Sequence, residues 1–149
     1  MKDIVDQDQM IAMLLQTFSE SKVVDRRINP SHGYRAVHVI ITREGLNVEI
    51  QIRSSLQHLW AELSERLADV IDSSIKYGGG EPQIQRYLSL TSEHIAKLEK
   101  SEKELSASEE TFLRQGLESQ SFQEIVARDK NILAEIFRDL ISRLHGPKR

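Results

Sequence analysis

An alternating pattern over residues 33–53 constrains the fold of this chain more than any other feature. The segment reads GYRAVHVIITREGLNVEIQIR, with β-branched and other apolar residues on both sides of Glu44–Gly45. Alternation around a short glycine-containing turn is typical of a β-hairpin. We therefore expect two strands, over residues 34–42 and 46–53.

The length of the turn decides which side chains of the hairpin share a face. A two-residue turn at Glu44–Gly45, or a four-residue loop over 43–46, places His38 opposite Gln51. A three-residue loop would shift the register and place His38 among apolar residues. We favour the even register because it keeps one face apolar for helices to cover. The residues of that face are Val37, Val39, Ile41, Val48, Ile50 and Ile52.

The opposite face is polar in this register, because successive side chains of a strand point to opposite sides of the sheet. It carries Tyr34, His38, Glu49, Gln51 and Arg53. A carboxylate can hold a divalent cation or accept a hydroxyl proton, a tyrosine ring can stack on a base, and Arg or His can bind phosphate oxygens. The alternative is a solvated outer face with a cross-strand ion pair.

Helical periodicity surrounds the hairpin. Apolar residues at spacings of three and four predict helices over residues 7–18, 54–72 and 122–144, and a more charged helix is expected over 84–105. In the second of these, Trp60 falls on the apolar stripe and is expected in the core.

Shorter signals complete the pattern. Asp6 or Asp8 is expected to cap the first helix, and KVVDRR to form a short strand. KYGGGEP at 76–82 is interpreted as a helix stop or hinge, since no Lys-Ser/Thr follows its glycines. SASEE and QGLESQS are expected to break the C-terminal helices.

These elements predict an α+β fold, with a small mixed or antiparallel sheet, flanking helices and a C-terminal helical extension. We expect an α/β unit over residues 1–76, a glycine-rich break over 77–82 and a helical arm or hairpin over 83–149.

Composition excludes several classes of function. The chain has 149 residues, no cysteine and a formal net charge of -3, so we expect neither disulfides nor thiolate metal sites and no general attraction to nucleic acid. With no long apolar run and no signal-peptide pattern, a soluble cytoplasmic protein without a membrane partner is expected. One local basic cluster could bind phosphate or be a solvated edge, and consists of Lys22, Arg26, Arg27 and Arg35, with His32 among them.

The polar face belongs to a longer pattern. Gly33, Tyr34 and His38 are followed by EIQIR at 49–53 and by His58 and Glu62 on the next predicted helix. In this order and spacing, residues 20–70 resemble the synthetase domain of the RelA/SpoT family, the enzymes that make the alarmones ppGpp and pppGpp. The resemblance implies a partial nucleotidyltransferase-like domain, of the small alarmone synthetase type.

The resemblance also implies a role for each matching residue. Tyr34 would stack on the guanine of GDP or GTP, and Glu49 would act at Mg²⁺ and on the attacking ribose 3′-hydroxyl. The reaction would move pyrophosphate from ATP to that hydroxyl, and positioning and charge neutralisation would supply most of its rate. The other residues implied in substrate binding are His38, Gln51, Arg53, His58 and Arg35.

Two departures from the family pattern leave other functions open. The Arg and Lys residues that grip ATP, and an Asp that binds magnesium, precede the hairpin in the family, and no counterpart is visible here. We therefore expect this chain to be the acceptor half of a synthetase. The loop residues Pro30, Ser31 and His32 stand where the family typically has Lys and Asn. Alternatives are a toxic small alarmone synthetase that pyrophosphorylates tRNA 3′ ends, or a truncated, non-catalytic module that binds a nucleotide or partner.

Two further signals have ordinary explanations. His58 and Glu62 have a spacing that can bind zinc, but two ligands do not make a site, and a surface ion pair is the simpler interpretation.

The apolar stripe of the last predicted helix either packs back on the α/β unit or pairs with a second copy. Small alarmone synthetases are often oligomers built through C-terminal helices, so the resemblance implies a homo-oligomer.

Overall fold

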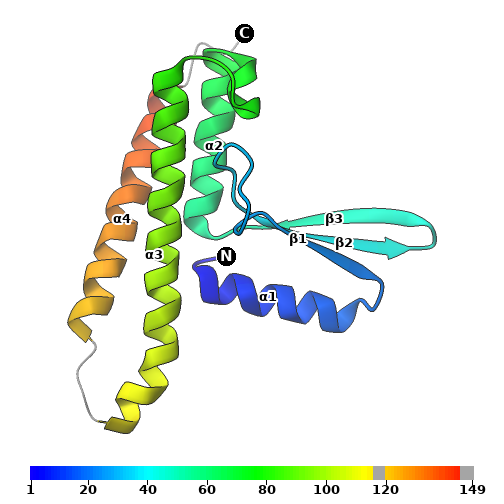
Figure 1. Ribbon diagram of the computed structural model, residues 1–149, viewed down its shortest axis with the longest axis vertical. Helices are drawn as coiled ribbons and strands as arrows, with labels where there is room; N and C mark the ends of the chain where they lie inside the picture. The colour runs from blue at the N-terminus through cyan, green and yellow to red at the C-terminus, as the bar shows by residue number, and fades with distance from the viewer. Residues whose placement is uncertain (116–119, 145–149) are drawn as a thin grey trace.

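The computed structural model describes residues 1–115 and 120–144. Its elements are α1 (Ile4–Thr17), β1 (Ser21–Asp25), β2 (Val37–Arg43), β3 (Leu46–Ile52), α2 (Ser55–Val70), the 3₁₀ helix η1 (Ser73–Tyr77), α3 (Pro82–Gln115) and α4 (Gln120–Arg143). The sheet and α1 project sideways from the long helices (Figure 1). The predicted α+β fold is confirmed, with an antiparallel sheet in the order β1-β2-β3.

The hairpin has the even register that we favoured. His38 pairs with Gln51, and Arg43 pairs with Leu46, so the turn consists of Glu44 and Gly45 alone. Both turn residues have positive φ, 53° and 77°, as the tight turns that match strand twist require. The apolar and polar side chains of the hairpin therefore lie on opposite faces.

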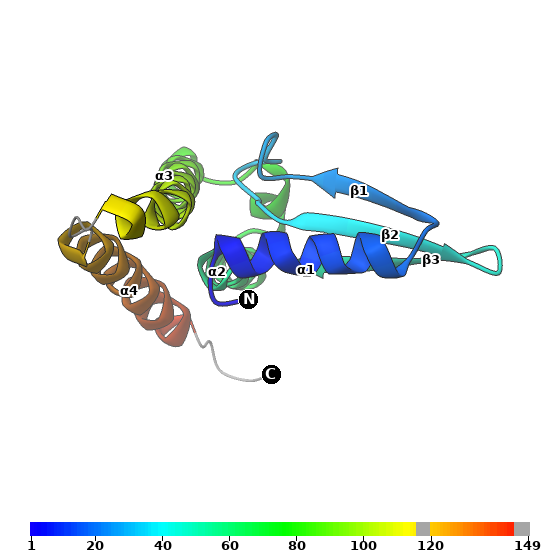
Figure 2. The same cartoon turned by 90° about the horizontal axis from the view of Figure 1, so that it is seen from below.

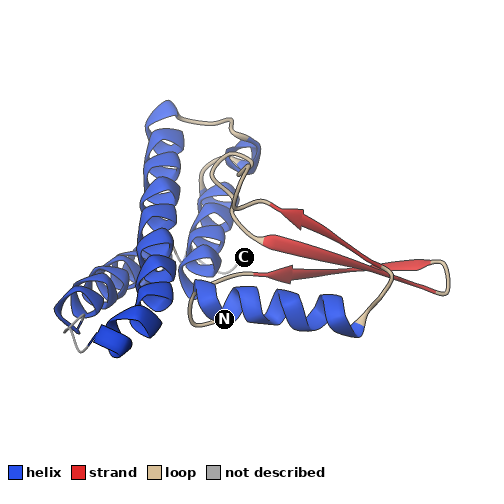
Figure 3. Ribbon diagram, turned by 60° about the horizontal axis from the view of Figure 1, so that its bottom comes forward, coloured by secondary structure: helices blue, strands red, loops and turns tan. Residues whose placement is uncertain are grey.

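Helix α1 covers the apolar face of the sheet (Figure 3). The contact joins Met10, Ile11, Leu14 and Phe18 of the α1 segment to Val39, Ile41, Ile50 and Ile52 of the sheet. Val48 is an exception on the face that we expected to be covered, because it is 56% exposed. It lies on the outer strand near the turn, and the buried part of this face stops short of it.

The predicted cap of α1 was wrong. The N-cap is Asp3, whose carboxylate accepts a hydrogen bond from the backbone N–H of Asp6 at 2.9 Å. Asp8 lies inside the helix, where its carboxylate contacts Arg27 and Lys103 at 2.6 Å each. The start was missed because Asp3 precedes the run of apolar residues from Met10 onward on which the helix is predicted.

The predicted break at SASEE was also wrong, because residues 106–110 lie inside α3. Alanine and glutamate are good helix formers and serine is tolerated, so this stretch has no strong reason to stop a helix. QGLESQS lies largely outside the described residues, and α4 begins at Gln120.

The main hydrophobic core lies where α2, η1, α3 and α4 meet. Phe137, Leu56 and Ile75 are almost fully buried there. Trp60 is in this core, as predicted, and its indole N–H donates to the Leu88 carbonyl at 2.9 Å. Seen from below, α2 lies between the sheet and α4 (Figure 2), so this core stands beside the sheet. None of the described helices is long and apolar enough to cross a membrane.

The apolar stripe of α4 is only partly covered. Leu133 and Phe137 are buried in the core, whereas Ile125, Ile132 and Ile136 are exposed. The buried residues of the stripe pack against α2 and α3, as the first interpretation predicts. The exposed residues could contact a second copy, as the second interpretation predicts.

Arg27 joins the loop after β1 to α1. Its guanidinium donates to Asp8 at 2.6 Å and to Asp25 at 2.7 Å. Burial alone would raise the pKa of Asp25, but the hydrogen bonds from Arg27 outweigh it, so that this pKa lies below its ordinary value of 3.8.

We expect Asp25→Asn to lower the free energy of unfolding by about 1–3 kcal/mol at pH 7, and by less at pH 3. When folding lowers the pKa of a carboxyl group, the group stabilises the protein at any pH above its pKa in the unfolded chain. This stabilisation is lost as the pH falls through the pKa of the group in the folded protein. Urea denaturation of wild type and variant at both pH values measures the effect. An equal difference at the two pH values would contradict the assignment.

Candidate functional site

The polar face is the side of the sheet turned away from α1 (Figure 3). The structure brings together all five residues that the even register placed there. They come from three segments: Tyr34 precedes β2, His38 lies on β2, and Glu49, Gln51 and Arg53 lie on or directly after β3.

Glu49 and His38 form one half of this cluster. The Glu49 Oε1 atom is 2.7 Å from His38 Nδ1, and it also accepts a hydrogen bond from Gln51 Nε2 at 3.3 Å. Nearly half of the Glu49 side chain is exposed, whereas His38 is largely buried. The carboxylate is therefore oriented by its neighbours and still open to a ligand.

Tyr34 and Arg53 form the other half. Arg53 Nη2 donates to the Tyr34 hydroxyl oxygen at 2.8 Å and to Gln51 Oε1 at 2.7 Å. The guanidinium carbon lies 5.1 Å from the centre of the Tyr34 ring, within range of a cation–π interaction. A base that stacks on Tyr34 therefore has to share the ring with Arg53 or displace it.

The imidazole of His38 connects the two halves. Its Nε2 atom is 3.1 Å from the Tyr34 hydroxyl oxygen, and its ring meets the Tyr34 ring edge-on with centroids 5.8 Å apart. Because its other nitrogen contacts Glu49, a chain of polar contacts runs from Arg53 through Tyr34 and His38 to the carboxylate.

Gly33 sets the position of Tyr34. Its φ is +86°, and a Cβ atom at this position would lie 2.8 Å from the Trp60 ring. Only glycine adopts this backbone conformation readily and leaves room for the indole. The loop before Tyr34 is also fixed at His32, whose ring packs against Gly78.

His58 and Arg35 lie outside the hydrogen-bonded cluster, and their roles stay predictions. His58 and Arg53 together line two surface hollows, of about 500 and 360 Å³. The Arg35 side chain donates to the Arg27 carbonyl, and its buried Nε has no partner within the described part of the chain.

Two members of the predicted basic cluster have structural contacts. Arg27 is engaged by Asp8 and Asp25, and Arg35 turns inward to the Arg27 carbonyl. Lys22 and Arg26 are exposed, so a phosphate attracted to this edge would meet those two first.

Glu49 could contribute to a metal site but does not form one alone. Over residues 1–115 and 120–144, no group of three or more His, Cys, Asp or Glu side chains is arranged to hold a metal ion. Magnesium in nucleotide enzymes is commonly bound by one or two carboxylates together with substrate phosphates. The single open carboxylate of Glu49 fits that arrangement only with a nucleotide present.

Sequence patterns missed a group of buried polar residues behind the face. Gln7, Ser54, Gln57 and Glu99 are all buried and bond to one another or to the backbone around Arg53. Burial raises the pKa of Glu99, and hydrogen bonds from Ser54 and Gln57 only partly offset this. Gln7 gave a usable signal, because it falls on the apolar stripe of its helix.

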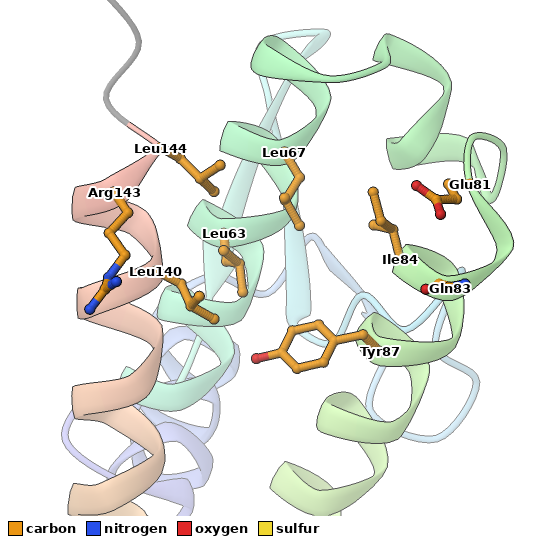
Figure 4. Close-up of a pocket in the computed structure, with 9 residues that line it drawn as sticks. All are labelled: Leu63, Leu67, Glu81, Gln83, Ile84, Tyr87, Leu140, Arg143 and Leu144. Carbon is orange, nitrogen blue, oxygen red and sulfur yellow. The ribbon is translucent and has the colours of Figure 1, made fainter.

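A separate apolar pocket of about 390 Å³ lies between α2, α3 and α4. Figure 4 shows Leu63 and Leu67 facing Leu140 and Leu144 on one side and Ile84 and Tyr87 on the other. The polar residues that line it are Glu81, Gln83, Tyr87 and Arg143. It offers none of the side chains that form the polar face.

Comparison with known proteins agrees with these features. The profile of the family described as "Region found in RelA / SpoT proteins" matches residues 1–77, which run from the N-terminus through η1. The chain belongs to the RelA/SpoT family. The match extends beyond the pattern over residues 20–70 at both ends, since it includes α1 and η1.

Similar curated proteins come from mycobacteria. One uncharacterized protein of Mycobacterium bovis and two of Mycobacterium tuberculosis strains are each 51% identical to this chain over 53 residues, which is 36% of the chain and 19% of the relative. The chain thus spans about a fifth of the length of these relatives.

Proposed function

We propose that the polar face binds the acceptor nucleotide of an alarmone synthetase reaction, in which ATP transfers pyrophosphate to the 3′-hydroxyl of GDP or GTP. The observation that carries the proposal is the position of Glu49. Its oriented, open carboxylate shares one face with an aromatic ring and a guanidinium. Family membership supports the same assignment.

Each residue of the face has a task in this reaction. The Tyr34 ring would stack on guanine, and Arg53 and Gln51 would meet the polar edge of the base or the ribose. Glu49 would accept the proton of the 3′-hydroxyl, while His38 holds its carboxylate in place. The 3′-oxygen would then bond to the β-phosphorus of ATP as the bond to the α,β-bridging oxygen breaks and AMP leaves.

Magnesium, when bound with the nucleotide phosphates, would neutralise their charge during transfer. Glu49 is the residue of this face that would hold it. ATP itself would be bound largely by groups other than those of the polar face. We also propose a cytoplasmic location, where both nucleotides occur.

We expect Tyr34→Ala to weaken GDP binding about 5- to 150-fold, since stacking of a base on an aromatic ring contributes about 1–3 kcal/mol. Tyr34→Phe keeps the ring and loses only the hydroxyl that Arg53 and His38 contact, so its loss should be smaller. Tyr87→Ala, in the apolar pocket, is the control. Calorimetric titration with GDP measures all three. Equal affinities for wild type and Tyr34→Ala would refute the stacking role.

A tRNA 3′ end is a second candidate acceptor for the same face. The observation that favours it is the loop before Tyr34, where Pro30 and Ser31 offer no cation and His32 packs against Gly78. Such a loop would hold a 5′-diphosphate poorly, whereas a terminal adenosine needs only stacking and contacts to its ribose. Competition of deacylated tRNA against GDP distinguishes the two acceptors.

The exposed part of the α4 stripe suggests a homo-oligomer. Two copies of α4 could pack antiparallel about a two-fold axis that passes between Arg128 and Asp129. Arg128 of each copy would then face Asp129 of the other, and Ile125 would face Ile132. Both charges are solvent-accessible and only 3.6 Å apart within one helix. A light-scattering mass equal to one chain would remove this proposal.

A further inference from the structure

Helix α3 contacts the chain directly beside two residues of the polar face, Tyr34 and Arg53. Ser92 Oγ donates to the Gly33 carbonyl oxygen at 2.6 Å, and Gly33 directly precedes Tyr34. One residue beyond Arg53, Ser54 Oγ donates to the Glu99 carboxylate at 2.5 Å. Ser92 and Glu99 are seven residues apart, which places them two turns apart on the same side of the helix. They are 2% and 5% exposed.

The backbone on both sides of Arg53 is held by this set of buried groups. Gln7 Nε2 donates to the Ile52 carbonyl oxygen at 2.7 Å, and the Ser54 N–H donates to Gln57 Oε1 at 3.3 Å. Gln57 Nε2 in turn donates to both Glu99 oxygens at 2.9 Å. The position of Arg53 is therefore fixed by its neighbours Ile52 and Ser54. Glu99 holds Ser54 in place by accepting hydrogen bonds from Ser54 and from Gln57.

These contacts come from outside the part of the chain that defines the family. The family profile ends at residue 77, whereas α3 begins at Pro82. In the proposed division into an acceptor unit over 1–76 and an arm over 83–149, Ser92 and Glu99 belong to the arm. They nevertheless touch the two segments whose side chains meet at the 2.8 Å contact between Arg53 and Tyr34.

We propose that α3 is a positioning element of the acceptor site, in which Ser92 positions Tyr34 through Gly33 and Glu99 positions Arg53 through Ser54. A buried polar group that loses its partner costs more than the hydrogen bond itself, so removing either side chain releases the segment that it holds. The effect on nucleotide affinity rests on the proposed function. The effect on the two backbone segments does not.

The test compares Ser92→Ala and Glu99→Ala with two exposed controls on the same helix, Ser89→Ala and Glu93→Gln. Glu99→Gln is a conservative variant that keeps an oxygen for Gln57. The first measurement is amide hydrogen exchange in the intact chain. We expect exchange at residues 33–35 and 52–55 to accelerate about tenfold in the two alanine variants, to change less in Glu99→Gln, and to stay unchanged in the controls.

The second measurement is the dissociation constant of GDP, expected to rise about tenfold in the alanine variants, which corresponds to one lost buried hydrogen bond. Unchanged exchange at both segments would overturn the proposal. So would acceleration spread evenly over the whole chain, because that would show a general loss of stability. If Glu99→Ala does not fold, Ser92→Ala still decides the role of Ser92 at residues 33–35, and Glu99→Gln decides the role of Glu99 at residues 52–55. If GDP binds to neither wild type nor variants, the proposed function fails, while the exchange data still decide whether α3 positions the two segments.

Discussion

Glu49→Gln is expected to slow pyrophosphate transfer by at least about a hundredfold, the usual loss when a general base is removed. The amide has nearly the same shape as the carboxylate, but it can neither accept the proton of the ribose 3′-hydroxyl nor bind a magnesium ion well. Because nearly half of the Glu49 side chain is exposed, the substitution should leave the fold intact. The measurement is the rate of label transfer from ATP to GDP in the intact protein.

Glu44→Gln is a suitable control, since Glu44 lies in the turn of the same hairpin and is exposed. It removes the same charge from the sheet without touching the polar face, and its rate should equal that of wild type. GDP affinity should change little in either variant. A Glu49→Gln enzyme that transfers at the wild-type rate would show that another group takes the proton.

Gly33→Ala is expected to lower the free energy of unfolding by about 2–6 kcal/mol, as the sum of two costs. An alanine at φ +86° carries backbone strain of about 1–3 kcal/mol, and its Cβ would lie 2.8 Å from the Trp60 ring, an overpacking cost of about 1–3 kcal/mol. Urea denaturation measures the total. Since Gly33 also sets the position of Tyr34, GDP binding should weaken in parallel.

Gly45→Ala separates the two costs. Gly45 has a similar φ of +77°, but nothing lies within 4 Å of a Cβ atom there, so that this variant carries strain alone. We expect it to be clearly more stable than Gly33→Ala and to bind GDP as wild type does. If the two variants are equally destabilised, close packing against Trp60 is not what requires a glycine before Tyr34.

The polar face could be predicted from sequence because it depends on local rules. The two-residue turn fixes the register of the hairpin, and the register alone places His38 opposite Gln51. Helical periodicity likewise placed Trp60 in the core. The start of α1 was missed because its cap, Asp3, lies two turns before Met10, where the apolar residues that predict the helix begin.

The support behind the face could not be predicted in the same way. Gln57 and Glu99 are 42 residues apart in the chain and meet only through the packing of α3 against α2. No local pattern indicates such a contact, since a glutamate in a highly charged helix is expected to lie at the surface. The division of the α4 stripe into buried Leu133 and exposed Ile132 depends on the same packing.

The most direct test of the central claim is to map where GDP binds on the chain by NMR chemical-shift changes. The account predicts that the largest changes fall on the polar face: Tyr34, His38, Glu49, Gln51 and Arg53. Changes centred on the apolar pocket around Leu63 and Leu140, or no change at GDP concentrations well above the micromolar range, would contradict it.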